Sequence, residues 1–220
     1  MKTLLLLPPL SKNGNNNGLI PRFAPYISAS VAAHIKKSFS SVAIFDAFLE
    51  KASFQDIILK INKYRPDIIG VPLVEVNREV PMETILSMIQ YVKTNNPENI
   101  IVVFGSKDLG LLLSYIEQND SIDYCIAGDP EEIVPDLIKA LDQNDQSKIR
   151  TTEGLIYKNG NKIVFTGERI VNDLDQLEFP AWDLVTLNNY SPLPHRYNNI
   201  KFYPLTSSRG CCYIKTNTEN

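Results

Sequence analysis

The sequence predicts an α/β fold built on a doubly wound, five-stranded parallel sheet. Five short apolar runs recur along the first 142 residues, at positions 4–7, 42–45, 68–74, 100–104 and 122–126. Each run is nearly continuous rather than alternating, as expected of strands that are covered on both faces. The segments between the runs are long enough for helices, and this alternation favours parallel strands joined by right-handed crossovers.

Three of the intervening segments carry recognisable helix starts. Residues 53–56, Ser-Phe-Gln-Asp, resemble a capping box that opens a helix expected to reach Tyr64. Pro81-Met82-Glu83 and Pro130-Glu131-Glu132 each place proline at the first turn with acid following, which suits the helix dipole. The segment around His34 is also expected to be helical.

The alternation of apolar runs and helical segments ends after residue 142. Residues 142–147 are polar and predict a linker, whereas residues 154–165 predict a β-hairpin with Asn159-Gly160 as its turn. Residues 185–201, rich in Asn, Pro and Tyr, predict an extended connector. The expected organisation is therefore a ligand-binding domain at 1–142, a linker with the hairpin at 143–200, and the start of a further domain at 201–220.

Charge, apolar runs and cysteine content argue against a nucleic-acid-binding, secreted or membrane-spanning protein. The net charge is −3 and no run of Lys or Arg marks a basic patch, so nucleic acid is not an expected partner. The apolar start ends at Pro8-Pro9, too soon for a secretion signal, and no run approaches the ~20 apolar residues of a membrane span. Three cysteines, two of them adjacent, make no disulfide framework, and a reducing cytoplasm is expected.

Ligands of doubly wound sheets bind at the carboxyl ends of the strands, near the switch point. The loop after the first run, residues 8–18, is long, polar and glycine-bearing, and Pro9, Ser11 and Gly14 are its candidate cofactor-binding residues. Its amides could cradle an anion or a large polar ligand. The loop matches neither the dinucleotide fingerprint nor a Walker motif. A solvated loop without a ligand is an equally good interpretation.

Two further groups of candidates follow later runs. Glu75, Asn77 and Arg78 could hold amide or carboxylate groups of a ligand, or form an internal ion pair that orders the loop. Glycines next to polar residues end the fourth and fifth runs, and such glycines permit either close approach of a ligand or a tight strand-to-helix turn. The candidates in this last group are Gly105, Ser106, Gly128, Asp129 and Glu131.

The histidines and the first cysteine suggest no metal site. His34 is expected to be a surface or packing residue, and His195 lies in the connector. Neither has a second His or Cys at metal-site spacing. Cys125 lies within the fifth run and is expected to be a small core residue.

Several motifs, taken in order, resemble the N-terminal part of cobalamin-binding-domain radical S-adenosylmethionine (SAM) proteins, over almost all of residues 1–213. Asp46 ends the second run as in that family, and Gly128-Asp129-Pro130-Glu131 is similar to the family's Gly-Glu-Gly-Glu. The other matching stretches are the Leu-Leu-Pro-Pro first run, residues 122–124, 154–157 and 174–183, and Ser208-Arg209-Gly210-Cys211.

The resemblance implies a Rossmann-like (flavodoxin-like) cobalamin domain joined to a radical SAM barrel, in enzymes that include methyltransferases and a tetrapyrrole ring cyclase. It makes Cys211 the candidate metal ligand, the first of three cysteines that hold a 4Fe–4S cluster. Lys215 and Thr218 stand where the other two belong, and residues 105–108 replace Gly-Gly-x-His. No Asp-x-His-x-x-Gly follows the first run, which implies cobalamin bound without a protein histidine.

These departures lead us to expect a chain truncated at the start of the radical SAM domain and inactive alone, with cluster and SAM chemistry only in the complete protein. Phe179, Trp182, Tyr203 and the hairpin would pack on the missing C-terminal domain, so aggregation or proteolysis is expected from about residue 185 onward. Two alternatives remain open, a non-catalytic cobalamin or tetrapyrrole module and a flavodoxin-like interaction domain without cofactor.

Overall fold

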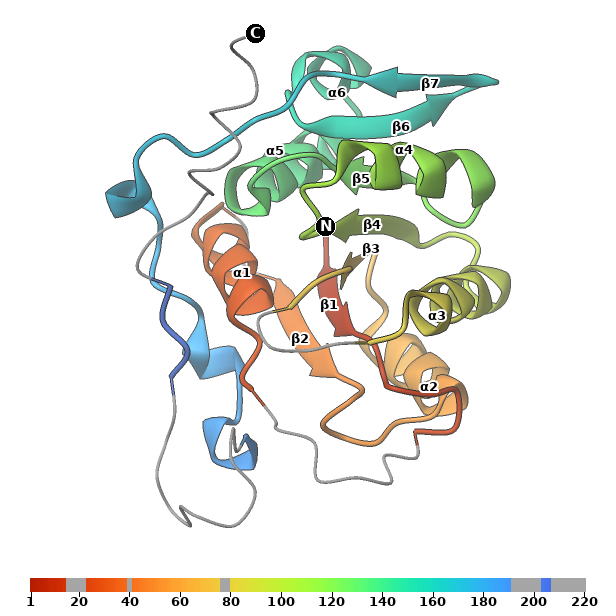
Figure 1. The fold of residues 1–220 in the computed structure, drawn as a ribbon, viewed down its shortest axis with the longest axis vertical. Coiled ribbons are helices and arrows are strands. Elements are labelled where there is room, and N and C mark those ends of the chain that lie inside the picture. The colour runs from red at the N-terminus through yellow and green to blue at the C-terminus, as the bar shows by residue number, and fades with distance from the viewer. Residues whose placement is uncertain (15–22, 39–40, 76–79, 191–202, 207–220) are drawn as a thin grey trace, which may run out of the picture.

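A computed structural model describes residues 1–14, 23–38, 41–75, 80–190 and 203–206. The strands of this part of the chain form one seven-stranded sheet in the order β2-β1-β3-β4-β5-β6-β7, with helices on both faces (Figure 1). The strands are β1 (Thr3–Leu7), β2 (Val42–Asp46), β3 (Ile68–Pro72), β4 (Ile100–Phe104), β5 (Tyr124–Ile126), β6 (Leu155–Asn159) and β7 (Lys162–Phe165). The helices are α1 (Tyr26–Ser38), α2 (Phe54–Tyr64), α3 (Met82–Asn95), α4 (Leu109–Gln118), α5 (Pro130–Asp142) and α6 (Gln146–Thr151), with short 3₁₀ turns at Leu174–Gln176, Trp182–Leu184 and Leu187–Asn189.

The first five strands are parallel and confirm the expected α/β class. Their order, β2-β1-β3-β4-β5, is the flavodoxin-like order of doubly wound sheets. The apolar face of α1 packs with α5 on one face of the sheet, and α2, α3 and α4 cover the other. The switch point of the sheet, where the order of successive strands reverses, lies between β1 and β3. These two strands pair Thr3 with Ile68 and Leu5 with Gly70.

The hairpin corrects the expected strand number. β6 pairs antiparallel with β5, matching Cys125 to Ile156, so the hairpin extends the parallel sheet rather than following it as a separate element. Asn159 pairs with Lys162, and the turn residues are therefore Gly160 and Asn161, one position later than predicted. Gly160 has a φ of 60°, as the first central residue of a type II′ turn requires.

The predicted helix starts agree closely with the structure. Ser53 and Asp56 form the capping box of α2, each side chain accepting from the other's backbone N–H. α3 begins at Met82, directly after Pro81, and α5 begins at Pro130. Helix α6 was not predicted: it begins inside the polar stretch 142–147, for which the sequence predicts a linker, and Asp145 caps it by accepting from the N–H groups of Ser147 and Lys148.

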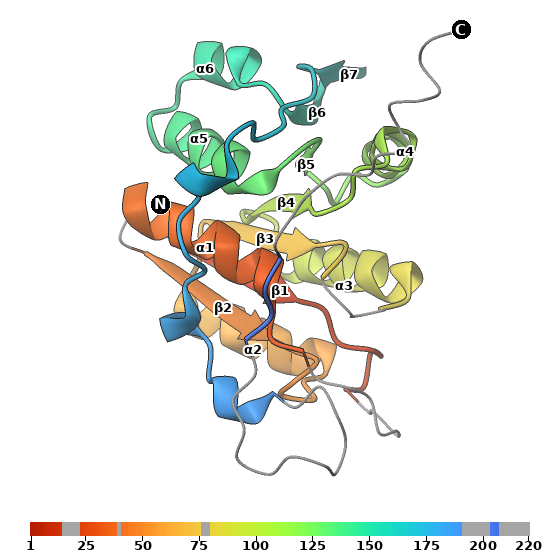
Figure 2. The same ribbon diagram turned by 60° about the vertical axis from the view of Figure 1, so that its left-hand side comes forward.

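Residues 177–190, here called the strap, run across α1 (Figure 2). The backbone N–H of Ala181 donates to the carbonyl of Ala29 at 2.9 Å, and the Glu178 N–H donates to Nε2 of His34 at 3.1 Å. Lys36 and Lys37 form ion pairs with Asp183 and Glu178 of the strap. Among the described residues, no helix has the length and apolar character needed to cross a membrane.

Candidate functional site

The carboxyl ends of the five parallel strands lie at one edge of the sheet, as the sequence predicted. The parallel registers bring the ends of β1 and β2, and those of β3 and β4, directly side by side. The loops that follow these strands, and the first turn of α5, carry the candidates Pro9, Ser11, Gly14, Glu75, Gly105, Ser106, Gly128, Asp129 and Glu131. Asn77 and Arg78 belong to the same edge in sequence but lie outside the described residues, as do His195, Cys211 and Cys212.

The loop after β1 is held by its neighbours. Pro9 is buried, and the N–H of Gly14 donates to the carbonyl of Ser11 at 3.1 Å. Gly14 has a φ of 69°, and a Cβ placed there would lie 2.0 Å from the carbonyl oxygen of Lys51. This glycine therefore serves the close approach of two loops, which is a structural role.

Glu75 turns inward from the loop after β3 and is only 6% exposed. Its Oε1 accepts hydrogen bonds from the N–H of Ser28 at 2.7 Å and from the Ser28 hydroxyl at 2.5 Å. Its Oε2 accepts from the N–H of Ile27 at 3.1 Å. The carboxylate thus satisfies the first turn of α1, a role that the sequence did not predict, whereas Arg78, its expected partner in an internal ion pair, lies outside the described residues.

Gly105 and Ser106 follow β4 in a tight turn. A Cβ on Gly105, whose φ is 97°, would lie 2.9 Å from the carbonyl oxygen of Val74. The glycine thus allows the loop after β3 to pack against the end of β4. Ser106 is buried, and its Oγ accepts from the N–H of Asp108 at 3.2 Å. Both residues thus fix the conformation of the turn at this edge of the sheet. Lys107, which follows them directly before α4, is exposed.

Gly128, Asp129 and Glu131 follow β5 and are all buried. The backbone of Gly128 forms an isolated parallel bridge with Arg169, so a Cβ on this glycine would lie 1.9 Å from the Arg169 carbonyl oxygen. Asp129 is 3% exposed, pairs with Lys107 at 3.1 Å, and accepts from the N–H of Val171 at 2.9 Å. These residues join the edge to the segment that leads into the strap.

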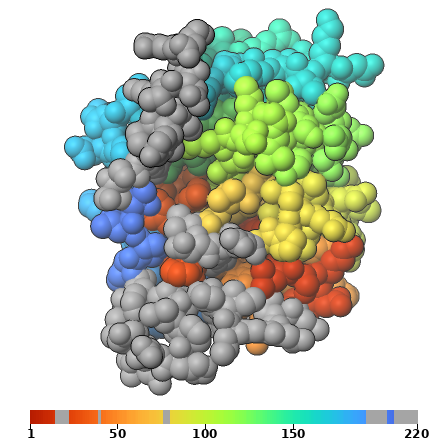
Figure 3. All heavy atoms as spheres, viewed as in Figure 1, coloured from red at the N-terminus to blue at the C-terminus, as the bar shows by residue number. Residues whose placement is uncertain are grey.

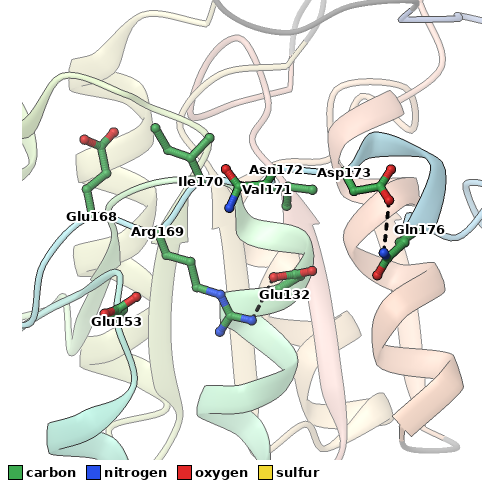
Figure 4. Close-up of a pocket in the computed structure, with 9 residues that line it drawn as sticks. All are labelled: Glu132, Glu153, Glu168, Arg169, Ile170, Val171, Asn172, Asp173 and Gln176. Carbon is green, nitrogen blue, oxygen red and sulfur yellow. Dashed lines mark hydrogen bonds and ion pairs between the residues drawn. The ribbon is translucent and has the colours of Figure 1, made fainter.

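The described residues line three hollows that bear on this edge. The first, of about 20 Å³, lies at the switch point between β1 and β3 and is lined by Leu7, Pro8, Pro72, Leu73, Glu75, Val80 and Ile85. The second, of about 550 Å³, lies beside α5, where Arg169 pairs with Glu132 and Asp173 accepts from Gln176 (Figure 4). The third, of about 540 Å³, is lined by Lys12, Asn13 and residues of α2 and α3. Figure 3 shows the start of the chain (red) lying against α3 (yellow) at the surface. Only the first lies at the switch point, and it has room for little more than a water molecule.

Neither His34 nor Cys125 has the surroundings of a metal ligand. Burial lowers the pKa of His34, against the opposing effect of nearby Glu131, Glu178 and Glu132, and its Nε2 already accepts from the strap. Burial also raises the pKa of the Cys125 thiol to about 12, as befits the core residue predicted. Within the described ranges, no group of three or more His, Cys, Asp or Glu could hold a metal ion.

One polar contact at the edge was missed on the sequence. The Tyr190 hydroxyl donates to Oδ2 of Asp46 at 2.8 Å, and both residues are buried. The sequence marks Asp46 only as the end of a strand, whereas in the structure its carboxylate joins the end of the strap to the end of β2. The 144 residues that separate the two leave no local sequence signal.

The chain is similar to several known proteins of greater length. It is 25% identical over 213 residues to an uncharacterized methyltransferase of Pyrococcus horikoshii, covering 96% of this chain and 43% of that protein. It is 23% identical over 172 residues to the anaerobic magnesium-protoporphyrin IX monomethyl ester cyclase of Cereibacter sphaeroides, covering 77% of this chain and 27% of the relative. No protein-family model matches the chain.

Solved structures confirm the fold. The cobalamin-dependent SAM radical enzyme OxsB, with aqua-cobalamin and SAM bound, superposes with a TM-score of 0.61 at 18% identity, covering 84% of this chain and 24% of OxsB. OxsB with aqua-cobalamin alone gives a TM-score of 0.62. The resemblance to cobalamin-dependent radical SAM proteins that the sequence predicted is thereby confirmed, and the chain spans less than half the length of the relatives it matches.

Proposed function

We propose that this chain binds cobalamin over the carboxyl edge of its parallel sheet. The observation that carries the proposal is the fold itself, a flavodoxin-like sheet whose five parallel strands deliver their loops to one edge, shared with a protein solved with aqua-cobalamin. Ligands of doubly wound sheets bind at that edge. When bound, cobalamin supplies a cobalt centre that can carry a methyl group.

The residues of the edge fit a corrin that brings its own equatorial ligands. A corrin presents neutral amide arms, which call for hydrogen-bonding groups rather than for a cluster of charges. Ser11 and Ser106 belong to the loops after β1 and β4, and the exposed Lys107 pairs with Asp129 between β4 and β5. We propose that these loops contact the amide arms, with Asn77 as a further contact, and that no histidine of the described residues ligates cobalt.

Radical SAM chemistry is a wider proposal. It needs a 4Fe–4S cluster and SAM, and Cys211 is the residue that we propose as one cluster ligand in a complete enzyme. Methyl transfer or tetrapyrrole ring closure would be the reaction class, following the names of the relatives. With Lys215 and Thr218 at the other two positions, anaerobic iron–sulfide reconstitution of this chain should give no stable cluster spectrum.

Cobalamin binding is tested by incubating the chain with hydroxocobalamin, removing free corrin on a desalting column, and reading corrin absorbance against protein. We expect about one corrin per chain. Lys107→Trp places bulk on the exposed turn after β4, whereas Glu98→Trp places the same bulk before β4, at the opposite edge. The first variant should weaken binding at least about tenfold, equivalent to about 1.4 kcal/mol, and the second should bind normally. No retained corrin, or equal loss in both variants, would contradict the proposal.

A further inference from the structure

Helix α1 follows β1 and begins beside the switch point, but its own sequence supplies no cap. Pro25 precedes the helix and carries no side-chain acceptor, and the first turn contains no acidic residue. The first N–H groups of a helix have no partner within the helix and need acceptors from elsewhere. Among the bonds between described residues, the N–H of Ala29 is the first of the helix to donate to a backbone carbonyl, that of Pro25 at 2.9 Å.

Glu75 supplies the missing acceptors from 47 residues further along the chain. Its two carboxylate oxygens accept from the N–H groups of Ile27 and Ser28 and from the Ser28 hydroxyl, at 3.1, 2.7 and 2.5 Å. Its side chain also lines the small cavity at the switch point. A buried, negatively charged group thus occupies the positive end of α1, where the helix dipole favours it.

In other doubly wound sheets this position holds a ligand's phosphate. A helix that starts at the carboxyl edge offers N–H groups and a positive dipole to an anion, and flavodoxin-like sheets bind FMN at the switch point between β1 and β3. In this chain the same donors are already bonded to Glu75. A phosphate placed there would lose those donors and meet a like charge.

We propose that Glu75 is a specificity-determining residue, a built-in anion that excludes ligands with a terminal phosphate from the N-terminus of α1. The inference rests on the proposed function, which assigns the carboxyl edge of the sheet to a corrin. It deepens that function, because Glu75 distinguishes a corrin site from the flavin mononucleotide site of the same topology. The excluded ligands are flavin mononucleotide and similar phosphate-headed cofactors.

The test removes the internal anion and offers phosphate in its place. Glu75→Ala frees the three donors and leaves a space that adjoins the cavity at the switch point. Replacing chloride by about 50 mM inorganic phosphate at constant ionic strength should raise the Tm of this variant by at least about 3 °C, because a ligand bound only by the folded state stabilises it. The wild type should show no such difference between the two salts.

Two control variants separate a vacated site from a general salt effect. Asp145→Ala removes a carboxylate that accepts from two N–H groups at the exposed start of α6, so it should stay insensitive to phosphate. Glu75→Gln removes the charge but keeps the volume, and should also stay insensitive. If Glu75→Ala is unfolded in chloride, phosphate should restore its helical circular dichroism. An equal phosphate response in the wild type, or none in Glu75→Ala, overturns the proposal.

A flavin comparison tests the excluded ligand directly. Riboflavin and FMN differ by the phosphate, so quenching of flavin fluorescence should show FMN preference in Glu75→Ala and none in the wild type. FMN preference in the wild type would overturn the inference. Hydroxocobalamin retention by the wild type is measured in parallel, so that failure of the corrin proposal is read from that arm while the phosphate arm still decides the role of Glu75.

Discussion

Gly128 lies where the end of β5 meets the segment leading into the strap, and its replacement by alanine should be among the costliest single-methyl changes in the chain. Its φ of 129° is a conformation that residues with a Cβ rarely adopt, at a cost of about 1–3 kcal/mol. The added Cβ would also lie 1.9 Å from the carbonyl oxygen of Arg169, so that backbone must move.

Moving Arg169 disturbs two hydrogen bonds, from Asp129 N–H to the Arg169 carbonyl at 3.0 Å and from Arg169 N–H to the Ala127 carbonyl at 3.4 Å. Each such bond contributes about 0.5–1.5 kcal/mol net. Together with the backbone conformation, these terms predict that Gly128→Ala lowers the free energy of unfolding by about 2–6 kcal/mol.

Gly167 provides the matched control, because its φ is 99° but nothing lies within 4 Å of an added Cβ. Gly167→Ala should therefore show only the conformational cost of about 1–3 kcal/mol. Urea unfolding followed by far-UV circular dichroism gives both values by linear extrapolation. Equal costs for the two variants would refute the argument that the bridge to Arg169 requires a glycine at position 128.

Three further outcomes follow from the buried polar and ionisable groups. Burial lowers the pKa of His34 below 6.5, so the hydrogen bond that its Nε2 accepts from the Glu178 N–H is fully formed above that pH and is lost as the pH falls through the folded pKa. The fluorescence of Trp182, the single tryptophan, should change at that pH, and the change should be absent in His34→Gln. Because burial raises the pKa of Cys125 to about 12, peptide mapping should find it unalkylated in the native chain and modified in denaturant. Tyr190→Phe leaves a buried carboxylate without one donor, so limited trypsin should release the strap faster than in the wild type, and equal rates would count against this anchor.

The strands and most helix starts could be predicted because their signals are local. The capping box of Ser53 and Asp56 spans four consecutive residues and needs no tertiary partner. Each apolar run likewise indicates a strand buried on both faces, and this signal does not depend on which segments cover the strand. The turn of the hairpin was displaced by one residue, because the strand pairing places Gly160 rather than Asn159 at the first turn position.

The roles of the candidate residues could not be predicted, because their partners are remote in the sequence. A glycine after a strand serves a ligand and a neighbouring loop equally well, and only the structure shows that the Cβ positions of Gly14, Gly105 and Gly128 are taken by the backbone of other loops. For Glu75 a signal did exist. Pro25, directly before α1, offers no side-chain acceptor and the first turn of α1 has no acidic residue, which indicates that the acceptor comes from elsewhere.

The order of strands also bears on how the chain is made. After β1 and β2, each strand from β3 to β7 pairs with a strand that precedes it in the sequence, and each is added at the same edge of the sheet. A chain emerging from the ribosome can therefore build its sheet by adding strands at one edge, while β2 stays at the other. The last strand added is β7, only four residues long and opened by Lys162, and such short, charged edge strands discourage the addition of another chain.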